Sequence, residues 1–243
     1  APRCATARGG GGSLADLGFT GGTQTVGIID TGLYTGHCRY RNAPARRGSW
    51  QLDGAGGCGN LHWDAPAARV SYMRAACGSS WCQRFETDHS APEHDHGTHV
   101  ASTVLDLTDA RVVLQDAQHS QRSDADAIVL PADVYTDSFS ALHGCAGAGI
   151  ISMSWAADTR GEYTYLERAL DFYCWQHPDA LMVVAAGNVG GTGAGSVGTP
   201  ASAKNALVVG AVLATREMLE TVCVDRTSDA YRDAWQRGAA RED

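Results

Sequence analysis

The sequence lacks any long hydrophobic run. None of its 243 residues belong to a stretch of about 18 consecutive apolar side chains, so no segment is predicted to span a bilayer. Its densest basic stretch, which holds Arg39, Arg41, Arg46 and Arg47, is interpreted as a solvated loop, and its 19 basic and 27 acidic side chains give a net charge of −8. This acidic surplus argues against a nucleic-acid-binding protein. Because 44% of the residues are hydrophobic, the composition excludes a disordered chain and predicts a globular one.

The chain opens at Ala1 without an initiator Met and without a charged and apolar signal segment. We therefore expect either that a leader has been removed or that the sequence is a fragment. The even count of eight cysteines suits an oxidising compartment and predicts a secreted or extracytoplasmic protein with some disulfides. Cys145 and Cys174 fall within predicted helices and could be plain buried thiols, whereas Cys77 and Cys82 have no second pair that would complete a zinc site.

Three regions of different character follow one another along the chain. Residues 1–21, which include a run of four glycines, are predicted to be a flexible N-terminal stub, and residues 213–243 a divergent polar tail. Between them, residues 22–212 carry alternating apolar strands and helices. The expected strands cover residues 25–30, 69–73, 110–115, 149–154, 181–186 and 206–212, and the expected helices cover residues 96–107, 134–146 and 162–176. The rest of residues 36–93 is expected to form long surface loops.

This order of elements predicts an α/β fold. The strands are apolar on both faces, which is typical of a mostly parallel sheet with helices on both faces, a three-layer arrangement. In such sheets, active sites gather beyond the carboxyl ends of the strands. Three polar side chains follow predicted apolar runs or begin a predicted helix, and are candidates for that edge: Asp30, His96 and Asn188.

Each of the three residue types suits a different chemical role. The Asp30 carboxylate, directly after a buried strand, needs a donor or cationic partner. An imidazole group has an ordinary pKa near neutrality, so a positioned histidine such as His96 can accept and return a proton. The side-chain amide of Asn188 can donate to a developing oxyanion. Taken alone, each residue also has a purely structural interpretation. Asp30 could form a turn or cap a helix, and Asn188 could form a turn.

A metal site is the competing interpretation of the histidine-rich segment. His94, His96 and His99 crowd together with acidic residues, and they would suit a zinc-dependent hydrolase. The zinc-protease pattern His-Glu-x-x-His is absent, however, and no distant third ligand stands out. We therefore predict no metal at this site.

Taken in order, the motifs resemble those of the subtilisin superfamily of serine peptidases. They are Asp-Thr-Gly at residues 30–32, His-Gly-Thr-His-Val-Ala at 96–101, Ile-Ser-Met-Ser-Trp at 151–155 and Ala-Ala-Gly-Asn at 185–188. The resemblance covers about residues 22–212. Trp155 and residues 203–206, Ala-Lys-Asn-Ala, are most similar to a subgroup of alkaline subtilases with an added C-terminal β-domain. An aspartic peptidase is rejected because the Asp-Thr-Gly triplet occurs only once.

The resemblance implies a catalytic relay of Asp30 and His96, with Asn188 as the oxyanion donor. It implies that Ser154, Trp155, Ala156 and Gly187 bind an extended polypeptide substrate, partly by pairing with it as an added strand. No cofactor is required for this chemistry, and structural calcium is possible with ligands that are not assigned. The oligomeric state is left open.

The sequence departs from the family at the nucleophile. The family's serine lies in Gly-Thr-Ser-Met-Ala-x-Pro, and none of Ser196, Ser202 and Ser228 has that setting. Ala156 also replaces a glycine beside the substrate strand. We therefore expect an inactive fragment of a serine endopeptidase, its C-terminal part incomplete. The alternative is a pseudopeptidase that binds peptides without cleaving them.

Overall fold

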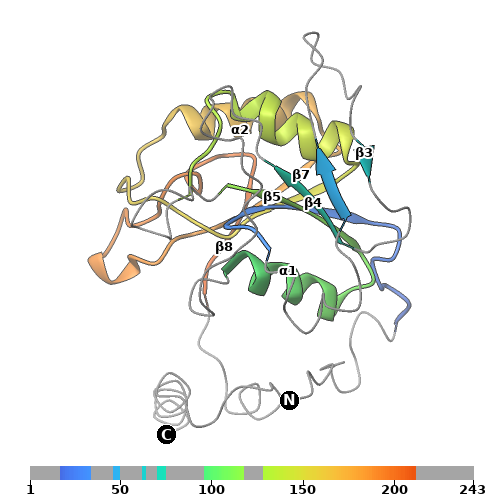
Figure 1. Cartoon of the computed structure of the whole chain (residues 1–243). Helices are drawn as coiled ribbons and strands as arrows, with labels where there is room; N and C mark the ends of the chain where they lie inside the picture. Colours follow the sequence, from blue (N-terminus) through green and yellow to red (C-terminus); the bar gives the residue numbers. More distant parts are fainter. Residues whose placement is uncertain are drawn as a thin grey trace, which may run out of the picture. The chain divides into compact units, whose positions relative to one another are not determined.

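A computed structural model describes residues 17–33, 46–49, 62–63, 70–74, 96–117 and 128–211 (Figure 1). Contacts along the chain divide it into two units. One unit is Gly21–Val209, and the other comprises the two chain ends, Ala1–Thr20 and Gly210–Asp243. The second unit lies almost wholly outside the described residues, as do the predicted N-terminal stub and polar tail. Their boundaries therefore stay predictions.

Among the described residues of Gly21–Val209, eight strands form one sheet in the order β3-β2-β4-β5-β1-β6-β7-β8. All neighbouring strands are parallel except β2 and β3, which are antiparallel. The predicted α/β fold with a mostly parallel sheet is thereby confirmed. The strands are β1 (Thr25–Asp30), β2 (Arg46–Ser49), β3 (His62–Trp63), β4 (Val70–Arg74), β5 (Arg111–Asp116), β6 (Ile150–Met153), β7 (Leu181–Ala185) and β8 (Leu207–Val209).

The loop prediction for residues 36–93 was wrong at two places. β2 pairs with β4, the strand predicted at residues 69–73, and β3 pairs with β2. The physical reason is that both are short strands at one edge of the sheet. Their sequences, Arg-Arg-Gly-Ser and His-Trp, carry no apolar alternation that would reveal a strand, and their pairing with neighbouring strands defines them.

Helices cover both faces of the sheet (Figure 1). α1 (His96–Leu107) matches its predicted bounds and packs on β1 and β5. η4 (Tyr135–Cys145) and α2 (Tyr165–Gln176) lie on the opposite face, and a short 3₁₀ turn, η5 (Gly190–Thr192), follows β7. η4 is a π-helix, in which the Ala146 N–H reaches back five residues to the Ala141 carbonyl at 3.1 Å. Among the described residues, no helix combines the length and apolarity needed to cross a membrane.

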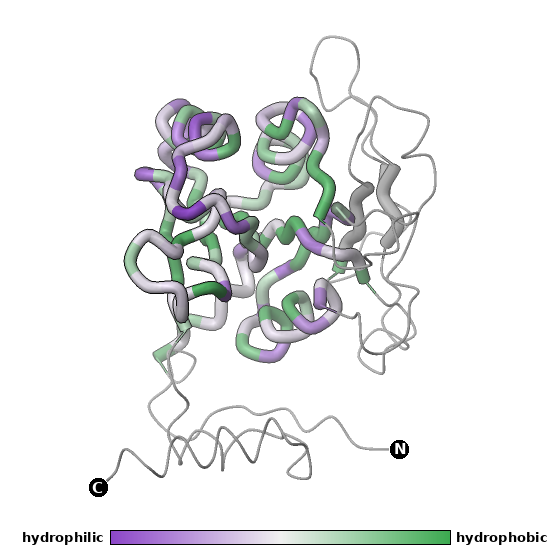
Figure 2. Tube along the Cα trace, turned by 90° about the vertical axis from the view of Figure 1, so that its left-hand side faces the viewer, coloured by the Kyte–Doolittle hydropathy of each residue, from purple (hydrophilic) through white to green (hydrophobic). Residues whose placement is uncertain are grey.

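Side chains along the central strands point alternately to the two faces of the sheet, and two separate hydrophobic cores result among the described residues. Ile28 and Leu114 point to the α1 face, whereas Ile29 and Val113 point to the face that η4 and α2 cover. Both faces of β1 and β5 are therefore buried, which explains their continuous apolar sequences. The helices carry hydrophobic and hydrophilic residues in turn, as Figure 2 shows, so that one side of each can face the sheet.

Candidate functional site

Asp30 and His96 lie in direct contact, as the motifs predict. Asp30 is the last residue of β1 and is 0% exposed, and His96 is the first residue of α1. The Nδ1 atom of His96 and the Oδ1 atom of Asp30 are 2.7 Å apart, and the imidazole is 51% exposed. A buried carboxylate thus holds one ring nitrogen while the ring itself reaches solvent. This arrangement fixes both the tautomer and the orientation of an imidazole.

A second contact between the same two segments supports the pair. The Thr31 N–H donates to Asp30 Oδ1 at 2.8 Å, and the Thr31 hydroxyl accepts a hydrogen bond from the Gly97 N–H at 2.9 Å. Thr31 therefore binds the carboxylate with its backbone and the start of α1 with its side chain. The Asp-Thr-Gly motif pointed to Asp30, but sequence reasoning did not assign this role to Thr31.

Close backbone packing explains the glycine after His96. A Cβ atom placed on Gly97 would stand 2.3 Å from the Gly32 carbonyl oxygen and 3.3 Å from Asp30 Oδ1. Only a residue without a side chain fits between β1 and α1 at this point.

The predicted substrate-binding segment follows β6, the neighbour of β1. Ser154 and Trp155 are half-buried, and Ala156 is exposed. The Trp155 Nε1–H donates to the Ile29 carbonyl at 2.9 Å, one residue before Asp30. This bond joins the segment to the strand that carries the buried carboxylate, a link that the sequence did not reveal.

Gly187 and Asn188 follow β7 at the same edge of the sheet. Gly187 has a φ of +104°, which favours glycine, and a Cβ atom there would lie 3.4 Å from the Cβ of Ala156. Asn188 is exposed. The structure thus brings Asp30 to His96 and Gly187 to Ala156, and it places Asn188 beyond the carboxyl end of a strand in the same sheet.

The cysteines and the histidines of the competing metal-site interpretation are described only in part. Cys174 is a free thiol, and Cys145 is bonded in a disulfide, which corrects its interpretation as a plain thiol. The other six cysteines and His94 lie outside the described residues, so the wider set of disulfides and the His94 alternative stay untested.

Calcium, which the resemblance made possible, prefers oxygen ligands. Within the described part of the chain, one group of side chains that could hold a metal ion contains two histidines, His143 and His177, with Asp179. Two ring nitrogens and one carboxylate do not fit calcium.

Comparisons with known proteins place the chain in a family. No curated protein matches it. Among solved structures, it is similar to the psychrophilic subtilisin-like protease Apa1 from the Antarctic psychrotroph Pseudoalteromonas sp. AS-11, with 17% identity and a TM-score of 0.48, over 78% of this chain and 36% of that chain. It is also similar to the prenylagaramide maturation protease PagA, with 19% identity and a TM-score of 0.41, over 77% of this chain and 53% of that one.

The chain therefore spans about a third to a half of the length of these two structures. A model of the Subtilase family matches residues 21–231, a range that includes Asp30, His96 and Asn188. Since this match covers most of the sequence, the chain belongs to the Subtilase family, a family of serine peptidases.

Proposed function

We propose that this chain is the peptidase domain of a serine endopeptidase, in which Asp30 and His96 form the proton relay. The observation that carries the proposal is the 2.7 Å contact between a fully buried carboxylate and a half-exposed imidazole at the carboxyl edge of a parallel sheet. Membership of the Subtilase family supports it.

The geometry suits transfer of a proton through the second ring nitrogen of His96. With Asp30 accepting from Nδ1–H, the Nε2 atom is the base that takes the proton from a serine hydroxyl and later returns it to the leaving amine. The carboxylate stabilises the imidazolium that forms between these steps. Asn188 is the proposed side-chain donor to the oxyanion, and no cofactor is needed.

The proposed substrate is a polypeptide bound in extended form along residues 154–156. This segment continues β6 and is supported from both sides, by Trp155 on β1 and by the paired backbones of Ala157 and Thr199, with hydrogen bonds of 3.0 and 2.9 Å. Main-chain pairing would provide affinity, and neighbouring side chains would provide specificity. We propose that the chain belongs to the alkaline subgroup of the family, because Trp155 and residues 203–206 are similar to that subgroup's sequence.

The nucleophile is proposed to lie in a segment outside this sequence. The Ser202 hydroxyl lies 2.9 Å from the Glu162 carbonyl and 3.0 Å from Glu167 Oε1, so it is engaged at the start of α2. Ser196 precedes β8, and Ser228 lies outside the described residues; neither has the family's Gly-Thr-Ser setting. A disulfide at Cys145 supports the proposal of an oxidising, extracytoplasmic location.

The test compares the chain of 243 residues with the protein translated from its complete transcript. We expect the short chain to cleave no fluorogenic peptide, and the complete protein to cleave it and to react with a fluorophosphonate probe. In the complete protein, Asp30→Asn should lower kcat by about 10⁴-fold, because the imidazole would adopt the wrong tautomer. A transcript that stops after Asp243, with no hydrolysis by its product, would overturn the proposal in favour of a peptide-binding pseudopeptidase.

A further inference from the structure

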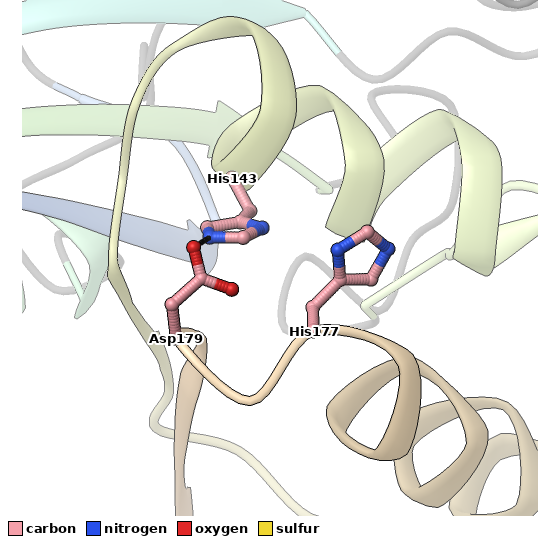
Figure 3. Close-up of side chains that lie close together, drawn as sticks. All are labelled: His143, His177 and Asp179. Atoms are coloured by element: carbon pink, nitrogen blue, oxygen red, sulfur yellow. Dashed lines mark ion pairs between the residues drawn. The ribbon is translucent and has the colours of Figure 1, made fainter.

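A second group of titratable side chains lies away from the relay, on the helical layer formed by η4 and α2. His143 belongs to the last turn of η4, His177 ends α2, and Asp179 lies in the turn before β7. One ligand atom from each residue lies within 4.8 Å of the other two. In Figure 3 the two imidazole rings and the carboxylate are turned toward one another from these three segments.

The separation between His143 and Asp179 differs from that of an ordinary hydrogen-bonded pair. The Nε2 atom of His143 is 3.4 Å from Asp179 Oδ2, which is longer than the usual 2.7–3.2 Å of a hydrogen bond. Two ligands of a tetrahedral ion, each about 2.0–2.1 Å from the metal, are separated by about 3.4 Å. The separation found here therefore matches two ligands that share one ion.

Tyr173 contacts both rings. The His143 Nδ1 atom is 3.0 Å from the hydroxyl of Tyr173, so its Nε2 atom is directed at Asp179. The His177 ring stacks on Tyr173 with centroids 4.3 Å apart, and its Nε2 atom lies 3.4 Å from the Tyr135 hydroxyl, beyond the usual range of a hydrogen bond. A hydrogen-bond partner such as Tyr173, on the nitrogen of His143 that does not bind metal, fixes histidine ligands in metal sites.

We propose that His143, His177 and Asp179 bind one divalent transition-metal ion of the zinc class. Two neutral imidazoles and one carboxylate suit zinc, whereas calcium and magnesium prefer ligand sets built of oxygen. The side chain of Asp179 is 75% exposed and that of His143 is 12% exposed, so the site is open on one side, where water completes the coordination.

The position of the site gives it a structural role. Asp179 precedes the first residue of β7, and Asn188 follows the last, so the ion would lie at the opposite end of this strand from the proposed oxyanion donor. It would join the end of η4 to the end of α2 and to the entry of β7. The ion is thus a cross-link of the helical layer and takes no part in peptide hydrolysis.

The experiment measures zinc retention by the full chain. The protein is stripped with a chelator, its free thiols are alkylated, and it is dialysed against zinc before the bound metal is counted by mass spectrometry. We expect one zinc ion per chain in the unaltered protein. His143→Gln, His177→Gln and Asp179→Asn should each weaken binding by more than the roughly 10–100-fold that loss of an outer partner costs. Tyr173→Phe, which removes only an outer partner, should fall within that range.

His99→Gln is the matched control, because His99 is exposed on α1 and belongs to the other histidine-rich segment. It should retain the ion. Asp179→Asn changes an exposed side chain, so circular dichroism should show an unaltered fold in that variant. Cobalt in place of zinc should show visible bands of tetrahedral nitrogen and oxygen ligation without sulfur-to-metal charge transfer.

Failure to retain zinc, equal retention by all variants, or loss in His99→Gln alone would overturn the proposal. Peptidase assays are not needed for any of these outcomes. The test is therefore independent of the proposed catalytic function.

Discussion

At the scale of single residues, the contact between β1 and α1 depends on the absence of a side chain at Gly97. The alanine Cβ would stand 2.3 Å from the Gly32 carbonyl oxygen, so the backbone would have to shift. We expect Gly97→Ala to lower the free energy of unfolding by about 1–3 kcal/mol, as overpacked substitutions do. Urea denaturation of the variant measures this change.

Gly144→Ala is the matched control for that substitution. Gly144 also lies in a helix, η4, but a Cβ atom there would meet nothing within 4 Å. The substitution reduces the backbone freedom of residue 144 in the unfolded chain, so the free energy of unfolding should stay unchanged or rise by about 0.4–1 kcal/mol. Equal losses in the two variants would show that the close contact of Gly97 is not the cause.

Motifs revealed the residues of the relay but not those around it. Asp30, His96 and Gly97 belong to short patterns whose spacing is local, so the sequence could indicate them. The hydroxyl of Thr31 and the carbonyl of Ile29 act through contacts with segments more than 60 residues away. His143 is likewise 36 residues from Asp179, with no motif between them, and only the packing of η4 on α2 brings the two together.

At the scale of elements, α2 owes its position to two buried acidic residues. Thr164 and Glu167 form a capping box at its start, where the Thr164 N–H donates to the Glu167 carboxylate at 2.7 Å. Further along, Asp171 accepts from the Tyr163 hydroxyl at 2.7 Å and from the N–H groups of Lys204 and Asn205 at 2.9 and 2.8 Å. α2 is therefore joined at both points to the chain around it.

These bonds make the helix sensitive to acid. Burial alone would raise the pKa of Asp171, but hydrogen bonds from Tyr163, Asn205 and Lys204 outweigh it and hold the pKa below its ordinary value. The same balance, with Thr164 and Thr199 as donors, lowers the pKa of Glu167. A lowered pKa stabilises the fold above the unfolded value of about 4, and this stabilisation is lost as the pH falls through the folded value.

We therefore expect the urea midpoint of the unaltered chain to fall as the pH drops below about 5. Asp171→Asn should be less stable near neutral pH and should show a shallower fall, since one of the titrating groups is gone. Tyr163→Phe removes a single donor to Asp171. Its urea midpoint near neutral pH and the steepness of its fall with pH should lie between those of the unaltered chain and Asp171→Asn. If the plots of urea midpoint against pH were parallel for all three proteins, the assignment of this pH dependence to Asp171 would be contradicted.

The elements that could be predicted were those with enough buried side chains. β1, β5, β6 and β7 form apolar runs, and α1 and α2 show helical spacing, so their existence followed from the sequence. β2 and β3 are short and carry no apolar alternation, so they could not be recognised. The apolar spacing of η4 predicted a helix, but a period of about four residues does not distinguish π from α hydrogen bonding.

At the scale of the whole sheet, the two cores are separated by its strands. Leu114 is buried on the α1 face, and Phe139 of η4 is buried on the other. We expect Leu114→Ala to cost about 2–5 kcal/mol and Phe139→Ala about 3–5 kcal/mol of unfolding free energy. Because the two side chains belong to separate clusters, the double variant should lose the sum within about 0.5 kcal/mol in urea denaturation. A larger discrepancy would mean that the sheet transmits strain between its faces.

The hydrogen bond from Trp155 to Ile29 has a consequence for any attempt to alter the proposed peptide specificity. The indole belongs to the segment proposed to recognise the substrate, yet its partner is the residue before Asp30. A substitution at Trp155 would therefore also change the support of Asp30, the carboxylate of the proposed relay. Ala156 is exposed and adjoins Gly187, so the proposed selectivity would be varied there without changing the contact between Asp30 and His96.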